Sequence, residues 1–294
     1  MDPNSRSGYI QAIIAFVLWG FAPIYFKALT SVTPYEIVAH RVIWSVFTLA
    51  AILYWQDKQF ISKVILGFKR HFKLLFIAAI LLTANWLVFI YAISVDKILE
   101  ASLGYYINPL VNVALGAIFL RERLTRFQKI AVLLAFIGVA QEIFRFGQIP
   151  TIALFLAVSF GTYGLLRKKA DISGTSGLII ETIMMLPFAL AYLFYLNSQG
   201  TLAFLHEGIT IDILLLSAGL VTSVPLIFFI GASKKIPYST LGMFQYIGPT
   251  LMGILGYFIY TESFPPGRLI TFTLVWSGLA LTVIENFRSQ PEKL

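Results

Sequence analysis

Two charged residues, Arg41 and Glu181, lie inside long apolar stretches and are the first candidates for chemistry. A charge at the centre of a membrane helix costs about 2.5–3.5 kcal/mol on insertion scales, so such a side chain is expected to face a cavity or the protein interior. Arg41 can bind an anionic group or close a gate, with Glu100 as its expected partner. Alternatively, it forms a structural ion pair or reaches the membrane surface. Glu181 can carry a proton, because an apolar setting disfavours a charged carboxylate, or it is a hydrogen-bonded structural group.

Other polar and aromatic residues offer weaker signals. His40 adjoins Arg41, and on a helix the two side chains point about 100° apart. His40 is a candidate proton relay, with a structural role as the alternative. Seven further residues are candidates to line a binding site: Trp19, Asn85, Tyr105, Tyr106, Asn108, Gln245 and Tyr246. Each also has a packing alternative, because buried amides join helices by hydrogen bonds and aromatic rings fill cores.

The motif Tyr-Ile-x-Pro occurs twice, at Tyr106 to Pro109 and at Tyr246 to Pro249. The two prolines are 140 residues apart. The same spacing relates Arg41 to Glu181 and six further pairs of like residues: Glu122 with Glu262, Gly138 with Gly278, Thr83 with Ser223, Phe89 with Phe229, Ala92 with Ala232, and Lys27 with Arg167. Repeated matches at one spacing indicate an internal duplication.

Pro109 and Pro249 are each expected to interrupt an apolar helix. Proline lacks a backbone donor and clashes with the carbonyl four residues earlier, which belongs to Tyr105 in one copy and Gln245 in the other. In lipid, freed backbone groups are tolerated only where protein or a water-lined cavity takes them up. Each proline therefore marks either a helix break that lines a binding site or a packing kink.

The composition is that of a polytopic membrane protein. The 294 residues are 58% hydrophobic and 12% charged, whereas a soluble domain is about 25% charged. The chain has no cysteine, which excludes disulfides and thiolate metal sites. The net charge of +8 comes from basic residues in short gaps between apolar stretches, which indicates membrane orientation and not nucleic-acid binding. Phosphate-loop, H-E-x-x-H and G-x-S-x-G motifs are missing from the sequence, so we expect no enzyme activity, metal or cofactor.

Ten apolar stretches are predicted to be membrane helices. They span residues 9–26, 35–55, 74–94, 99–120, 128–146, 150–166, 178–196, 211–230, 238–260 and 269–287. With the N-terminus inside, the outer connections hold only four basic residues: Lys27, Lys97, Arg145 and Arg268. This bias predicts that both termini are cytoplasmic. Residues 59–73, which mix apolar and basic side chains, are predicted to form a short interfacial helix or a solvated basic loop.

Five helices in each half have a geometric consequence. If the first helix starts inside, the sixth starts outside, so the halves 1–147 and 148–294 are inverted relative to each other. Inverted repeats with interrupted helices are a recurrent transporter plan, with the binding site near the midplane between the halves. No G-x-x-x-G occurs, so we expect a monomer or a weak dimer.

The chain resembles the EamA family of the drug/metabolite transporter superfamily. The resemblance rests on the duplicated five-helix plan and on Glu122 with Gly138 and Glu262 with Gly278, which end the two halves. We interpret these glutamates as architecture, each near the positive start of the next helix. Within the family, four stretches resemble the RarD-like permeases: residues 40–45, Asn85-Trp86, residues 100–109 and residues 244–250. The resemblance implies a permease of the bacterial inner membrane, with a central cavity lined by helices one to four and six to nine.

The expected function is therefore secondary transport of a small amphipathic metabolite or drug, such as an amino acid or a chloramphenicol-like compound. Its expected partners are that small-molecule substrate, the lipid bilayer and protons as a coupling ion. A non-transporting membrane sensor or scaffold and a lipid scramblase are the alternatives. A scaffold predicts a packed centre without a cavity, and a scramblase predicts a polar groove open to lipid.

Overall fold

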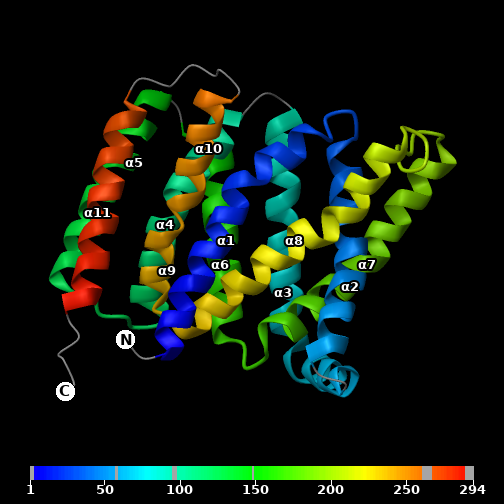
Figure 1. Ribbon diagram of the computed structural model, residues 1–294, viewed down its shortest axis with the longest axis horizontal. Helices are drawn as coiled ribbons and strands as arrows, with labels where there is room; N and C mark the ends of the chain where they lie inside the picture. Colours follow the sequence, from blue (N-terminus) through cyan, green and yellow to red (C-terminus); the bar gives the residue numbers. More distant parts are fainter. Residues whose placement is uncertain (1–2, 57–58, 95–97, 148, 260–266, 289–294) are drawn as a thin grey trace.

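The computed structural model describes residues 3–56, 59–94, 98–147, 149–259 and 267–288, in which all regular secondary structure is α-helical. The helices form one bundle, in which α1 begins and α11 ends at the same end (Figure 1). Their bounds are α1 (Pro3–Lys27), α2 (Pro34–Gln56), α3 (Phe60–Ser94), α4 (Ile98–Phe119), α5 (Arg126–Phe146), α6 (Thr151–Lys169), α7 (Gly174–Ser198), α8 (Ile209–Lys235), α9 (Tyr238–Phe244), α10 (Ile247–Phe258) and α11 (Arg268–Arg288).

Each predicted apolar stretch coincides with a helix, with α9 and α10 sharing the ninth. Six of the described helices are long and apolar enough to cross a membrane: α1, α2, α3, α5, α7 and α8. Two shorter apolar segments, Leu103–Phe119 and Leu269–Leu281, add to them. The fold is therefore that of an all-α, multi-pass membrane protein. The count of ten crossings and the inversion of the halves remain predictions.

The two prolines differ in their effect, and the expectation of a break at Pro109 is wrong. α4 runs through Pro109 without interruption. It packs so closely on α9 that a Cβ at Gly242 would lie 2.9 Å from the Pro109 carbonyl oxygen, and this close packing supports the helix on both sides of the proline. In the second copy the helix is interrupted at Gln245 and Tyr246, directly before Pro249. That interruption falls at the carbonyl with which the proline clashes.

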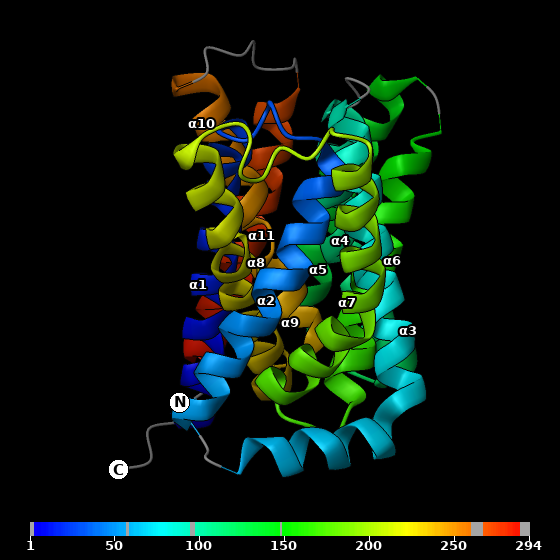
Figure 2. The same ribbon diagram turned by 90° about the vertical axis from the view of Figure 1, so that its right-hand side faces the viewer.

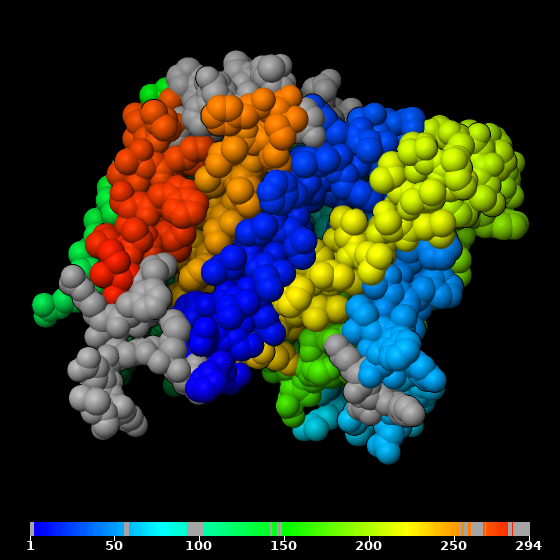
Figure 3. All heavy atoms as spheres, in the orientation of Figure 1, coloured from blue at the N-terminus to red at the C-terminus, as the bar shows by residue number. Residues whose placement is uncertain are grey.

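Packing between helices follows the duplication. If α1 to α5 are exchanged in order with α6, α7, α8, the α9–α10 pair and α11, each major contact has a counterpart. α1 packs on α8 as α6 packs on α3, and α2 packs on α8 as α7 packs on α3. α4 packs on α6 as the α9–α10 pair packs on α1, which lies between α10 and α8 in Figure 3. Three contacts, α2 with α7, α4 with α9 and α5 with α11, map onto themselves.

The pair α5 and α11 stands at one edge of the bundle (Figure 1). Two glycines allow these helices to approach closely: a Cβ at Gly138 would lie 3.3 Å from Thr271 Cα, and one at Gly278 would lie 2.9 Å from the Ala131 carbonyl oxygen. Both glycines therefore permit close packing of α5 on α11. α5 begins with a capping box in which Thr125 and Gln128 satisfy each other's backbone donors.

Glu122 has a different partner from the one expected. Its carboxylate accepts hydrogen bonds from the backbone of Tyr238 at 2.7 Å and of Ser239 at 2.9 Å, and also from the Ser239 hydroxyl. It therefore caps the start of α9 and not that of α5, the next helix in sequence. Glu262 lies outside the described residues.

Candidate functional site

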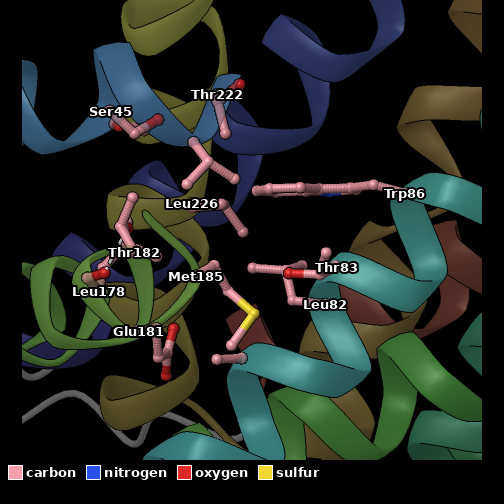
Figure 4. A pocket seen from close by; sticks show the side chains of 13 residues that line it. Ser45, Leu82, Thr83, Trp86, Leu178, Glu181, Thr182, Met185, Thr222 and Leu226 are labelled. Carbon is pink, nitrogen blue, oxygen red and sulfur yellow. Dashed lines mark hydrogen bonds between the residues drawn. The ribbon is translucent and has the colours of Figure 1, made fainter. Parts of the chain in front are cut away.

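A small cavity of about 20 Å³ lies between α2, α3, α7 and α8. It is lined by Val42, Ser45, Ala79, Leu82, Thr83, Trp86, Leu178, Glu181, Thr182, Met185, Thr222, Ser223 and Leu226. Figure 4 shows Ser45 and Thr222 toward one end and Glu181 at the other, with Leu226 and Met185 between them. The cavity has room for about one water molecule.

The lining is built from matched positions of the two halves. Ten of the residues form five pairs at the spacing of 140: Val42 with Thr182, Ser45 with Met185, Leu82 with Thr222, Thr83 with Ser223, and Trp86 with Leu226. α2 and α3 contribute one member of each pair, and α7 and α8 contribute the other. The cavity is therefore lined largely by equivalent positions of the two halves of the sequence.

Arg41 adjoins the Thr222 end of this cavity. Its Nε donates a hydrogen bond to Thr222 Oγ1 at 2.9 Å. Its guanidinium carbon lies 4.1 Å from the ring centroid of Trp86 and 5.4 Å from that of Phe26. The residue is only 8% exposed. Aromatic faces stabilise a desolvated guanidinium by about 2 kcal/mol, which offsets part of the cost of burial.

Among the described side chains, no carboxylate forms an ion pair with Arg41. Its expected partner, Glu100, is in the first turn of α4, and that side chain lies outside the described part of the structure. Arg41 thus presents a buried positive charge beside the cavity. The sequence does not indicate the contact with Thr222, because it joins positions 181 residues apart. Trp86 enters the sequence analysis only as part of the Asn85-Trp86 stretch, without a link to Arg41.

Glu181 lies at the opposite end of the cavity and is not isolated. Its Oε1 is 3.2 Å from Arg167 Nε, with both side chains buried. Tyr163 donates a hydrogen bond to Glu181 Oε2 at 3.3 Å. Arg167 also donates to the carbonyl oxygens of Ser173 and Gly174. A Cβ at Gly177 would collide with the guanidinium, so a larger residue there would force Arg167 to shift.

The structure pairs Glu181 with Arg167. Three atoms of the two side chains, Arg167 Nε, Arg167 Nη1 and Glu181 Oε1, make no hydrogen bond, and two of them, Arg167 Nε and Glu181 Oε1, face each other in the ion pair. The carboxylate is therefore both paired and incompletely satisfied.

His40 packs away from the cavity lining. Its Nδ1 accepts a hydrogen bond from Trp44 Nε1 at 3.0 Å, and its Nε2 is 3.9 Å from Glu36 Oε1. Glu36 Oε1 in turn accepts hydrogen bonds from the backbone N–H groups of Ala203 and Phe204 in the connection between α7 and α8. The structure thus brings His40 together with Glu36 and not with Glu181.

The other predicted polar residues join helices. Asn85 donates to the carbonyl oxygen of Leu156 and to Ser159 Oγ, tying α3 to α6. Asn108 donates to the carbonyl oxygen of Ala157, tying α4 to α6. Gln245 accepts from Asn112, which ties the interruption before α10 to α4. These contacts match the packing alternative weighed for buried amides.

The predicted aromatic residues also pack in the interior of the bundle. Trp19 contacts Phe16, Phe160 and Phe229. Tyr105 packs edge-on against Phe89, and Tyr106 packs against Tyr246. Of the residues proposed from sequence, only Glu181 lines the cavity directly, while Arg41 reaches it through Thr222 and Trp86.

Known proteins resemble this chain over nearly its full length. The model of the EamA-like transporter family matches residues 6–141. An uncharacterized transporter of Vibrio cholerae is 45% identical over 97% of this chain and 95% of its own length. Protein RarD of Escherichia coli is 42% identical over 98% and 97%.

A "chloramphenicol-sensitive protein RarD" of Pseudomonas aeruginosa is 30% identical over 97% of this chain and 96% of its own length. One crystal structure superposes with a TM-score of 0.71 over 97% of this chain and 99% of the other, at 16% identity, which shows a shared fold. The chain therefore belongs to the EamA-like transporter family, as a RarD-like permease, and is a membrane transporter.

Proposed function

We propose that this permease is a secondary transporter that moves small amphipathic metabolites or drugs, such as amino acids or chloramphenicol-like compounds, outward by alternating access. The observation that carries the proposal is the cavity lined by five residue pairs at the spacing of 140. A site formed equally by two equivalent halves reaches either side of the membrane by the same motion, performed by one half or the other.

The proposed topology has ten crossings in two inverted halves, with both termini in the cytoplasm. The exchange-related helix contacts support it, as does the placement of the start of α1 and the end of α11 at one end of the bundle (Figure 1). In inverted halves, two conformations related by exchange of the halves have similar energies. Because the two conformations differ little in free energy, a solute gradient or a proton gradient can shift the protein from one conformation to the other.

The size of the cavity sets a requirement on the mechanism. A space for about one water molecule does not hold a metabolite. Substrate binding therefore requires α2 and α3 to separate from α7 and α8. Leu82, Met185 and Leu226, which line the cavity, are apolar side chains without branching at Cβ, and the flexible methionine in particular suits a contact that opens and closes.

Arg41 is proposed to bind an anionic group of the substrate. A buried guanidinium without a carboxylate partner in the described structure is costly, and an anion that enters the cavity lowers that cost. The hydrogen bond to Thr222 and the stacking on Trp86 fix the plane of the guanidinium, which favours recognition of a flat carboxylate. The apolar residues between Arg41 and Glu181 then contact the body of the substrate.

Glu181 and His40 are the proposed sites of proton coupling. Glu181 has the stronger support, because it lines the cavity and its Oε1 is held only by the ion pair with Arg167, without a hydrogen bond. Protonation of Glu181 weakens its pairing with Arg167 and frees that end of the cavity to open. His40 acts, in this proposal, on the connection between α7 and α8 through Glu36.

The test is a solute screen followed by a flux measurement. Purified wild-type protein and Arg41→Ala are compared for thermal stabilisation by chloramphenicol, amino acids and other small amphipathic acids. Compounds that stabilise only the wild type are then assayed for flux in proteoliposomes under imposed pH and voltage gradients. We expect saturable flux of at least one such compound. Folded protein that moves none of them under any gradient contradicts the proposal and favours the scaffold alternative.

A further inference from the structure

The first part of α3 lies outside the bundle. It is seen lengthwise across the lower end in Figure 2 and end-on at the lower right in Figure 1, before α3 turns into the bundle. This part, which we term the cross-segment, comprises residues 60–73. It lies at the end of the bundle where α1 begins (Figure 2). Of the two alternatives predicted for residues 59–73, the structure shows the helix, as the first part of α3.

The cross-segment divides into three faces. One face packs on the protein: Phe60 and Val64 contact the main core, and a Cβ at Gly67 would meet Ile172 and Ile180. A second face carries an exposed apolar stripe of Ile61, Ile65, Phe68 and Phe72, which are 38–61% exposed. Their spacing of four, three and four residues places them within an arc of about 60° on the helix. The stripe therefore points in one direction, to one side of the face that packs on the protein.

The third face is basic. It carries Lys69, Arg70 and Lys73, all exposed, with Leu66 as its one large apolar exception. Arg70 reaches Asp171 at 3.7 Å, in the connection between α6 and α7. A helix with an apolar stripe beside a basic face lies in the membrane interface, with its apolar residues sunk to the level of the acyl chains. Its basic side chains then meet lipid phosphates.

We infer that the cross-segment is a docking site for anionic phospholipid, in which Lys69 and Lys73 contact the headgroup phosphates and the Ile61–Ile65–Phe68–Phe72 stripe contacts the acyl chains. Charge decides the class of lipid. A lysine near an anionic surface raises the binding constant about fivefold, whereas a zwitterionic lipid offers no net attraction. The surrounding packing holds the basic face in place, because Gly67 fits against Ile172 without room for a side chain.

The experiment uses the fact that the chain contains no cysteine. Ile65→Cys in the full-length protein is labelled with a fluorophore and reconstituted in phosphatidylcholine vesicles. Increasing fractions of acyl-brominated phosphatidylglycerol or acyl-brominated phosphatidylcholine are then added, and quenching of the label reports which lipids touch the stripe. We expect both lipids to quench, with phosphatidylglycerol reaching half-quenching at about fivefold to twentyfold lower mole fraction.

Two double variants, which remove the same net charge from different places, separate the effect of the cross-segment lysines from that of the net charge of the protein. Lys69→Gln/Lys73→Gln is expected to reduce the preference for phosphatidylglycerol to within about twofold of unity, while quenching itself persists. Arg123→Gln/Lys129→Gln removes the same charge from another exposed basic connection and is expected to keep the preference. Thermal unfolding in detergent confirms that each variant is folded.

Three outcomes overturn the inference. A label that neither lipid quenches shows that protein, such as a second copy of the chain, covers the stripe. Equal quenching by both lipids with all lysines present shows that no anionic lipid is selected. An equal loss of preference in both double variants shows that net charge acts without a site on the cross-segment.

Discussion

Tyr106 and Tyr246, which occupy equivalent positions of the two halves, pack against each other where α4 meets α9. Their ring centroids are 6.5 Å apart, and the Tyr246 hydroxyl donates a hydrogen bond to the Tyr106 carbonyl oxygen at 3.3 Å. Residues related by a two-fold operation touch each other only near its axis. The cavity between α2, α3, α7 and α8 is lined by residues paired at the same spacing. The contact and the cavity are therefore two points expected on one axis.

The inverted topology predicts where introduced cysteines are accessible. Lys63→Cys and Asp171→Cys are expected to react with a membrane-impermeant maleimide only after the inner face is opened, because both positions are predicted to lie on the basic, cytoplasmic side. His206→Cys, in the exposed connection between α7 and α8, is expected to react in intact cells. The chain without added cysteine is the control. Labelling of Lys63→Cys and Asp171→Cys from opposite sides rules out inversion.

Arg41 is expected to be essential for substrate binding. Arg41→Ala removes the only guanidinium beside the cavity on the Thr222 side of the described structure, and we expect at least a tenfold loss of flux, about 1.4 kcal/mol. Arg41→Lys is expected to fall between this variant and the wild type, since an ammonium keeps the charge but not the flat contact with Trp86. Arg123→Ala, at an exposed position, is the matched control. Wild-type flux in Arg41→Ala excludes the proposed role.

The buried Arg167–Glu181 pair predicts a strongly coupled double-mutant cycle. Arg167→Met or Glu181→Leu alone leaves one buried charge without its partner and is expected to destabilise the protein by about 3–5 kcal/mol. The double variant is expected to recover most of that loss, because apolar side chains of similar volume replace both charges. Thermal or denaturant unfolding in detergent measures the effect, with exposed Lys169→Met as the control on the same helix.

If the pair acts in transport as well as in folding, the double variant separates the two roles. It is expected to be stable but to have lost the dependence of flux on an imposed pH gradient. If flux through a stable double variant still depends on the pH gradient, proton coupling uses another residue, and His40 is the next one to substitute.

Glu122 predicts a symmetric pair of helix caps. Glu122→Gln keeps one acceptor but loses the charge at the start of α9, and we expect a loss of about 1 kcal/mol in unfolding free energy. The spacing of 140 places Glu262 in the matching role at the start of α4, so Glu262→Gln is expected to cost a similar amount. Glu207→Gln, at an exposed position, is the control. If Glu122→Gln destabilises the protein and Glu262→Gln does not, the glutamate cap is present at the start of α9 but not at the start of α4.

The close contact between α5 and α11 predicts that a larger side chain at Gly278 destabilises the protein. Gly278→Leu places a side chain against the Ala131 backbone and is expected to destabilise the α5–α11 contact by about 1–3 kcal/mol. Ala280→Leu, on the exposed side of the same helix, adds the same volume where nothing opposes it. A comparison of their unfolding midpoints measures the packing effect alone.

The sequence alone determined the class of fold, the approximate place of the apolar helices in the described residues, the repeated spacing of 140 and the EamA resemblance. Those features are local or periodic: apolar length, basic connections and a repeated spacing are each legible within one stretch or between two copies. The interruption at Gln245 and Tyr246 was also legible, because a proline acts on its own helix. The same rule failed at Pro109, where the packing of α4 against α9 keeps the helix continuous.

Only the tertiary structure decided which polar side chains meet. It paired Glu181 with Arg167, placed Trp86 and Thr222 around Arg41, and used Asn85, Asn108 and Gln245 as ties between helices. The physical reason is that these contacts depend on how each helix is rotated about its axis and which neighbour it packs on. In a helix whose apolar residues surround it on all sides, no amphipathic stripe records that rotation in the sequence.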